Sequence, residues 1–180
     1  MRQHQEYIRV MQSCGVAVKI LPPDEDYPDS CFVEDPAVVT EKMAVITNPG
    51  APTRNGETAA IRQALEEFFD ILEYIRAPGT LEGGDVLRVE NHFYVGLSTR
   101  TNAAGASQFI NIISKYGFAG SVVPLKEMFH LKTGVSYLGD NTLLVAGELI
   151  EHPQFSGFNK IVVDETEMYA ANCIRVNDYV

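Results

Sequence analysis

The chain has 180 residues, 46% of them hydrophobic and 21% charged, which is typical of one folded globular domain and argues against disorder. Its formal charge of -10 predicts no nucleic-acid partner, because phosphate backbones repel an acidic surface. The apolar runs are far shorter than the roughly 20 residues of a membrane span, and no secretory signal follows Met1. We therefore expect no membrane partner and a cytoplasmic location.

The elements predicted first are a helix over residues 2–13 and a buried strand over residues 16–21. Two longer helices are predicted over residues 57–72 and 101–116, followed by apolar strands at 71–77 and 121–125. Polar, turn-prone residues between β-rich runs predict hairpins, which pair residues 37–40 with 43–47, 86–89 with 93–97 and 135–138 with 143–146. A fourth hairpin is predicted to begin at residues 173–176 and to turn at 177–178.

The same order of helix, strand, loop and hairpin recurs roughly every 40 to 50 residues, which indicates modules that bury their apolar faces against neighbours. The pattern predicts an α/β fold. We expect one domain over residues 1–180, without an internal linker and with an incomplete set of modules.

Residues suited to chemistry lie just before the first strand of each predicted hairpin. They are Asp29, Glu34, Asp35, Glu82, Asp85, His130 and Asn172. If the modules surround an axis, these positions converge on its centre and form one candidate site.

The acidic segment around Glu34 and Asp35 predicts a cationic partner, because buried carboxylates are costly unless they are paired. A guanidinium fits, since its planar donors match carboxylate oxygens, although an acidic surface loop is an equally good interpretation. The two glycines between Glu82 and Asp85 allow close backbone approach, in a ligand site or in a plain turn. His130 lies between apolar neighbours, where a structural histidine is common.

Taken together, the stretches PDSCFVEDPAVVTEKMAVITNPGAPTR, LEGGDVL, VGLSTRTNAAGA, FHLKTGVSYLG and AANCIRVNDYV resemble the dimethylarginine dimethylaminohydrolase family of the amidinotransferase, or guanidine-modifying, superfamily. The resemblance covers nearly all of the chain from Leu21 onward. It implies the pentein fold, a pseudo-fivefold α/β propeller of ββαβ modules around a central channel, with about three to four of the five modules in this chain.

The resemblance also implies roles. His130 would be the general acid and base, and Glu82 would orient its imidazole. Asp35, supported by Glu34, would clamp the substrate guanidinium. The remaining substrate contacts implied are Asp29 for the α-amino group and Arg54 and Arg100 for the α-carboxylate, although without an anion these two arginines read as surface residues.

The implied reaction hydrolyses an N-methylated arginine to citrulline and methylamine or dimethylamine through a covalent cysteine thiouronium, without metal or organic cofactor. The three cysteines Cys14, Cys31 and Cys173 are predicted to be free thiols, and none matches the family nucleophile. Strand alternation makes Cys173 a packed core residue instead. The chain alone is therefore predicted to be inactive.

Two alternatives remain open. One is an arginine or agmatine deiminase on the same scaffold. The other is a non-catalytic guanidine-binding module, if the gene ends at Val180. Exposed sheet edges leave association into a homo-oligomer open as well.

Overall fold

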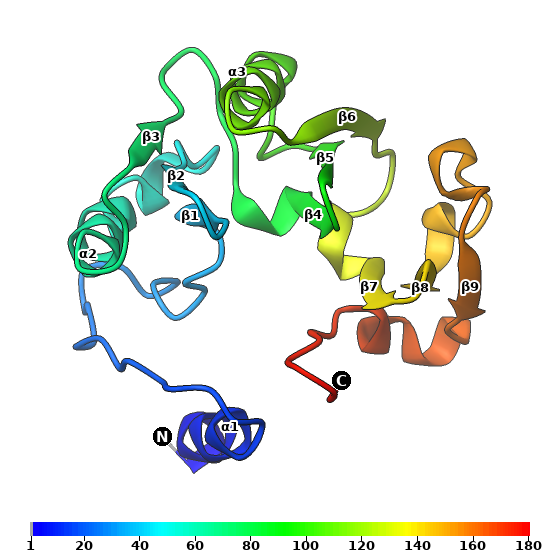
Figure 1. The fold of residues 1–180 in the computed structure, drawn as a ribbon, viewed down its shortest axis with the longest axis horizontal. Helices are drawn as coiled ribbons and strands as arrows, with labels where there is room; N and C mark the ends of the chain where they lie inside the picture. The colour runs from blue at the N-terminus through cyan, green and yellow to red at the C-terminus, as the bar shows by residue number, and fades with distance from the viewer. Residues whose placement is uncertain (1) are drawn as a thin grey trace.

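The computed structural model describes residues 2–180, which form three consecutive modules of one plan (Figure 1). In each module an antiparallel hairpin is extended by a third strand that runs parallel to the second. The strands are β1 (Ala37–Val39), β2 (Ala44–Ile46), β3 (Leu72–Tyr74), β4 (Val86–Val89), β5 (His92–Leu97), β6 (Ala119–Pro124), β7 (Val135–Gly139), β8 (Thr142–Val145) and β9 (Asn159–Val162). Successive modules begin 49 residues apart, so the predicted recurrence is confirmed.

Parallel strands need a crossover, and two modules supply it with a helix. The first crossover contains α2 (Glu57–Leu65) and the second contains α3 (Ala103–Ser114). Asn102 caps α3, because its side chain accepts a 2.8 Å hydrogen bond from the amide of Gly105. The third crossover uses short 3-10 turns instead, at Gly147–Leu149 and Pro153–Phe155.

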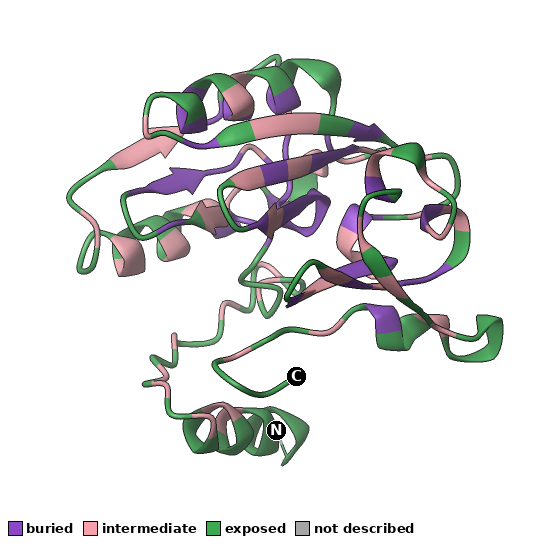
Figure 2. Ribbon diagram, turned by 45° about the vertical axis from the view of Figure 1, so that its right-hand side comes forward, coloured by how far each residue is buried: buried purple, intermediate pink, exposed green. Residues whose placement is uncertain are grey.

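Two buried apolar clusters hold the modules together. One joins the first and second modules and includes Met43, Leu81, Phe93 and Phe109. The other joins the second and third modules around strands β4, β7 and β8. Figure 2 shows this burial concentrated in the sheets and α3, whereas α1 (Arg2–Ser13) has no buried residue.

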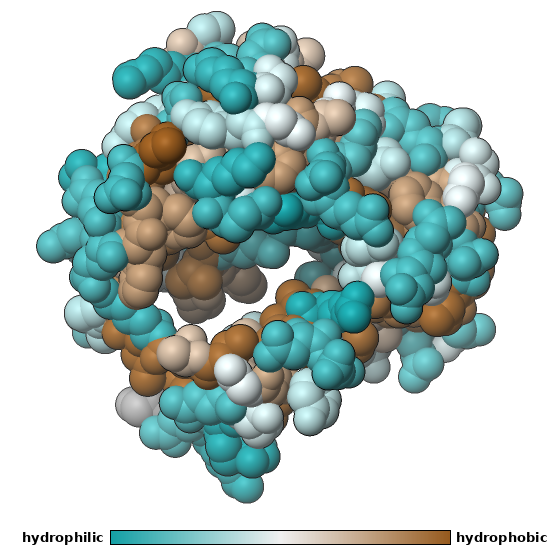
Figure 3. All heavy atoms as spheres, viewed as in Figure 1, coloured by the Kyte–Doolittle hydropathy of each residue, from teal (hydrophilic) through white to brown (hydrophobic). Residues whose placement is uncertain are grey.

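The modules are arranged as an arc around a central hollow, which the space-filling view in Figure 3 also shows. Helix α1 and the C-terminal segment lie on the open side of the arc. Among residues 2–180, one side-chain hydrogen bond of 2.7 Å joins the residue that follows α1 to the C-terminal segment, from Asn177 Nδ2 to the carbonyl oxygen of Cys14. The loops that precede the hairpins are thus brought toward one another.

Two predicted strands do not form. Residues 16–21 are extended, but no strand within residues 2–180 pairs with them, and a strand is stable only when its backbone groups find partners. Residues 173–176 likewise form no ladder, because a two-stranded hairpin without a further neighbour is marginal. The predicted turn is present, with Asn177 at a φ of 54° and a bridge between Val176 and Tyr179.

The predicted helix over residues 57–72 is also too long. The helix ends at Leu65, and the predicted apolar face does not extend beyond it, because Phe68 is 65% exposed. Three acids, at positions 66, 67 and 70, follow the last turn, where the helix dipole disfavours negative charge. Strand β9 was not predicted, although its Ile161 and Val162 are β-branched residues typical of strands.

Candidate active site

The loops that precede β1, β4 and β7 meet at one buried cluster. Side-chain atoms of Asp35, Glu82 and His130 all lie within 4.8 Å of one another, and all three residues are buried. The convergence expected for these three positions is therefore present in the fold. Such a set of oxygen and nitrogen atoms suits a cation, whether a metal ion or an organic group.

His130 lies between two carboxylates. Its Nε2 is 3.4 Å from Glu82 Oε2, and its Nδ1 is 3.2 Å from Asp85 Oδ2. Burial acts to lower the pKa of His130, but the neighbouring charges of Asp85, Asp35 and Glu82 outweigh it, so the pKa is raised above its ordinary value. The site thus favours the imidazolium, the form that can give a proton away.

The two glycines of the Glu82 motif allow this close packing. A Cβ atom on Gly84 would lie 2.8 Å from Asp35 Oδ1 and 3.0 Å from the ring of His130. On Gly83 it would overlap the carbonyl oxygen of Glu34. Gly84 also donates its amide to Asp35 Oδ1 at 2.8 Å, so the predicted close backbone approach is used to fix the carboxylate.

Arg54 is buried, not a surface residue. Its guanidinium lies 2.7 Å from both Asp35 Oδ2 and Glu57 Oε2, and 3.7 Å from Glu82 Oε2. Hydrogen bonds to Glu57 raise the pKa of Arg54, burial opposes them, and Asp35 adds to the rise. Glu57 was not predicted as a site residue, although a carboxylate three residues after an arginine on a helical turn is a recognisable pairing signal.

Arg100 reaches the same cluster from the loop after β5. Its guanidinium is 3.2 Å from Glu82 Oε1, and it lies over the ring of Phe129 with 4.8 Å to the ring centre. Its side chain remains 26% exposed. Arg100 therefore retains access to solvent, whereas the donors of Arg54 are engaged within the protein.

Three further predicted residues, Asp29, Glu34 and Asn172, are exposed and not buried in the cluster. Asp29 is exposed, and its backbone carbonyl rather than its carboxylate accepts a hydrogen bond from Arg54, at 3.2 Å. The exposed side chain of Glu34 pairs with Lys132 at 2.6 Å. Glu34 thus pairs with Lys132, which was not predicted as a site residue.

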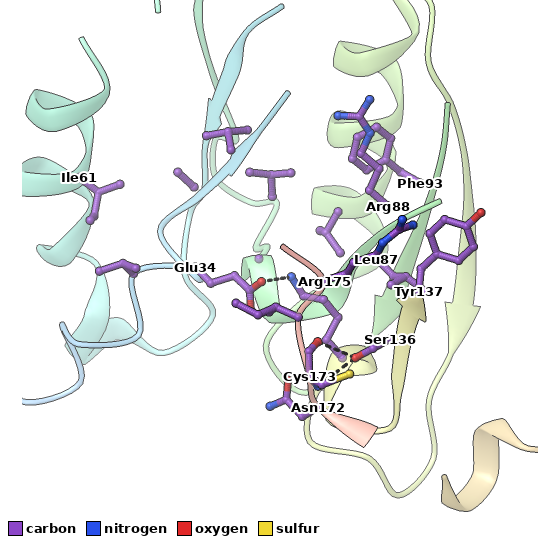
Figure 4. A pocket seen from close by; sticks show the side chains of 18 of the residues that line it. Glu34, Ile61, Leu87, Arg88, Phe93, Ser136, Tyr137, Asn172, Cys173 and Arg175 are labelled. Atoms are coloured by element: carbon purple, nitrogen blue, oxygen red, sulfur yellow. Dashed lines mark hydrogen bonds and ion pairs between the residues drawn. The ribbon is translucent and has the colours of Figure 1, made fainter. Parts of the chain in front are cut away.

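A cleft of about 500 Å³ lies beside the cluster and is lined in part by β1, β4 and β7 (Figure 4). Cys173 lines it next to Ser136, whose hydroxyl donates to the carbonyl oxygen of Cys173 at 2.8 Å; His130 is not among the lining residues. The prediction that Cys173 is a packed core residue is wrong, because without a strand ladder the alternation of buried and exposed faces does not arise.

Comparisons with known proteins match nearly the whole chain. The family model described as N,N dimethylarginine dimethylhydrolase, eukaryotic, matches residues 1–176. The chain is 52% identical to an N(G),N(G)-dimethylarginine dimethylaminohydrolase of Pseudomonas aeruginosa, over all of this chain and 71% of that protein. It is 38% identical to the protein of the same name from Streptomyces coelicolor, over 80% of this chain and 56% of that one.

Solved structures also match nearly the whole chain. A cysteine-to-serine variant of the Pseudomonas aeruginosa enzyme, complexed with citrulline, superposes with a TM-score of 0.96 at 52% identity, over 98% of this chain and 69% of that one. The N-terminal domain of ArgZ, a cyanobacterial arginine dihydrolase, superposes with a TM-score of 0.87 at 19% identity, which shows the shared fold alone. The same shares of 98% and 69% are covered there.

The arc of three-stranded modules, two of them with a ββαβ order, around a carboxylate–histidine cluster defines the chain as a pentein, the α/β propeller class of the guanidine-modifying superfamily. Within that class, the chain belongs to the dimethylarginine dimethylaminohydrolase family. The Pseudomonas and Streptomyces relatives are named as hydrolases of dimethylarginine. Among residues 2–180, no helix has the length and apolar character needed to cross a membrane.

Proposed function

We propose that this chain supplies the guanidinium clamp and the proton-transfer group of a dimethylargininase, which hydrolyses N-methylated arginine to citrulline and methylamine or dimethylamine. The observation that carries the proposal is the buried cluster of Asp35, Glu82 and His130 in a chain 52% identical to such an enzyme. Two carboxylates beside one histidine suit a planar cation that must be held and then protonated.

The chemistry follows from these positions. Asp35 accepts hydrogen bonds from the guanidinium, which keeps this group protonated, and therefore electrophilic, and fixes its plane. Glu82, whose Oε2 is 3.4 Å from Nε2 of His130, orients the imidazole. A cysteine thiolate adds to that carbon. The C–N bond to the methylated nitrogen then breaks as His130 donates a proton to the leaving amine. His130 next takes a proton from water, whose hydroxide adds to the thiouronium carbon. The C–S bond then breaks and restores the thiolate, and the added hydroxyl loses its proton to solvent as the carbonyl group of citrulline forms.

The nucleophile is proposed to come from a segment outside this chain. The chain spans 71% and 56% of the two dimethylargininases it matches, and none of its cysteines lies in the site cluster. A free thiol with a pKa near 8.5 needs positive charge nearby to ionise, and the imidazolium of His130 or the bound substrate would supply it. The reaction needs no metal or organic cofactor.

Arg100 and Asp29 are proposed to hold the two ends of the substrate. Arg100 is the arginine with access to solvent and suits the α-carboxylate, whereas Arg54 holds Asp35 and Glu57 in place. Asp29 is exposed and free to receive the α-amino group. The ion pair between Glu34 and Lys132 would have to break before the carboxylate of Glu34 could assist Asp35 in binding the guanidinium.

Citrulline release tests the proposal. The protein that carries the nucleophile should release citrulline from dimethylarginine faster than from arginine, and His130→Gln should abolish release. Faster turnover of arginine would instead favour the deiminase, which the fold shared with ArgZ keeps as the second candidate.

The 180-residue chain by itself should release no citrulline yet bind arginine analogues in calorimetry. Absence of binding by a folded sample would count against any guanidine site. Turnover by this chain that Cys173→Ser abolishes would show that the nucleophile lies within it.

A further inference from the structure

We propose that Asp85 is a positioning residue for His130: it accepts a hydrogen bond from Nδ1–H and thereby leaves Nε2 as the atom that exchanges protons. The placement of Asp85 stands on the geometry of the chain. Its consequence for catalysis rests on the proposed function.

Asp85 is fully buried and is surrounded by donors. Its Oδ2 accepts hydrogen bonds of 2.7 Å from the hydroxyls of Ser98 and Thr101, and its Oδ1 accepts one of 3.0 Å from the amide of Leu131. Leu131 follows His130 directly in the chain. Asp85 therefore fixes both the backbone and the side chain at the start of the third module.

The two hydroxyls cannot reverse these hydrogen bonds without losing others. The Ser98 hydroxyl accepts from the amides of Arg100 at 3.0 Å and Thr101 at 3.2 Å, and the Thr101 hydroxyl accepts from the amide of Glu82 at 3.1 Å. Their lone pairs face backbone donors, so their hydrogens point at Asp85. Each of these neighbours therefore requires Asp85 to act as an acceptor.

His130 Nδ1 is the complementary group. It is buried, has no hydrogen-bond partner in satisfactory geometry, and lies 3.2 Å from Asp85 Oδ2. An unsatisfied buried nitrogen costs free energy, and a small rotation of the ring would align Nδ1–H with the carboxylate. A small rotation of the imidazole would thus convert the His130–Asp85 contact into a charge-assisted hydrogen bond.

The surrounding charges decide which ring nitrogen keeps the proton. Glu82 shares its charge with Arg100 at 3.2 Å and Arg54 at 3.7 Å, and Arg54 also neutralises Asp35. Asp85 has no lysine or arginine within ion-pair distance among residues 2–180, so His130 is its cationic partner there. Asp85, the less neutralised carboxylate, therefore keeps the proton on Nδ1 of His130. Nε2, which faces Glu82, is left free to accept a proton.

Long-range ¹H–¹⁵N correlation spectra of the protein labelled with ¹⁵N-histidine test this, because they report the tautomer and pKa of each ring. His130→Gln assigns the His130 signals among the four histidines. Neutral His130 should carry its proton on Nδ1. In Asp85→Asn the proton should move to Nε2, since the amide can donate to Nδ1, and the pKa of His130 should fall by about one pH unit or more.

Glu82→Gln is the matched control, because Glu82 faces the other nitrogen; it should lower the pKa of His130 but leave the Nδ1–H tautomer in place. A folded Asp85→Asn protein whose His130 keeps both its tautomer and its pKa would overturn the proposal. If Asp85→Asn does not fold, Thr101→Val removes one donor to the carboxylate and should raise the pKa of His130. An unchanged pKa in that folded variant would also overturn it. Citrulline release does not enter this test, so failure of the proposed function would be seen separately.

Discussion

Arg54 lies where three carboxylates come within reach of one guanidinium, and two of these, on Asp35 and Glu57, are 2.7 Å from it. A buried charge left without its partner is costly, because neither water nor another cation replaces the lost interaction. We therefore expect Arg54→Gln to lower the free energy of unfolding by about 3–5 kcal/mol, measured by denaturant titration.

Arg62→Gln is the control for this change. Arg62 pairs with Glu66 at 2.9 Å on the surface, with both side chains 46% exposed, and such pairs contribute about 0–1 kcal/mol. Equal losses in the two variants would show that Arg54 does not balance the buried carboxylates.

At the scale of a structural element, Glu148 fixes the loop that precedes His130. This carboxylate accepts hydrogen bonds from the amides of Lys126, Glu127 and Met128, at 2.8 to 3.1 Å. In Glu148→Ala the three amides lose their acceptor, and their hydrogen exchange should accelerate about tenfold or more. The exposed Glu151→Ala is the control and should leave these amides unchanged.

This clamp should also depend on pH. Burial acts to raise the pKa of Glu148, but its backbone hydrogen bonds outweigh that and lower it below the ordinary value of 4.5. The stabilisation is therefore present above pH 4.5 and is lost as the pH falls through the lower folded-state pKa. Slow exchange of residues 126–128 that persists after full acidification would contradict the clamp.

At the scale of the whole molecule, stability is concentrated in the three modules. Helix α1 buries no residue, and isolated helices of about 12–15 residues are marginal in water. In the 180-residue chain, amides of α1 should therefore exchange about a hundredfold faster than those of β5, whose Phe93 and Val95 are buried. Hydrogen exchange followed by mass spectrometry measures this, and equal protection of α1 and β5 would show that α1 is packed against the modules.

The sequence predicted well where a local signal and its tertiary partner agreed. The hairpins at β1–β2, β4–β5 and β7–β8 were found from turn residues between β-rich runs, and each gains a third strand in the fold. Residues 16–21 carry the same local signal without a partner strand, and they remain extended but unpaired. Helix α2 was predicted too long because the apolar period continued past an acidic C-terminal turn.

The sequence by itself determined the modules, the family resemblance and the position of the chemical residues before each hairpin, because these depend on spacing along the chain. Only the tertiary structure decided that Arg54 is buried between Asp35 and Glu57, that Glu34 turns to Lys132, and that Asp85 approaches the second nitrogen of His130. Those outcomes depend on distances between residues up to 98 positions apart in sequence, such as Glu34 and Lys132. The packing of the modules determines which charged side chains come within reach of one another, and no local sequence pattern contains that information.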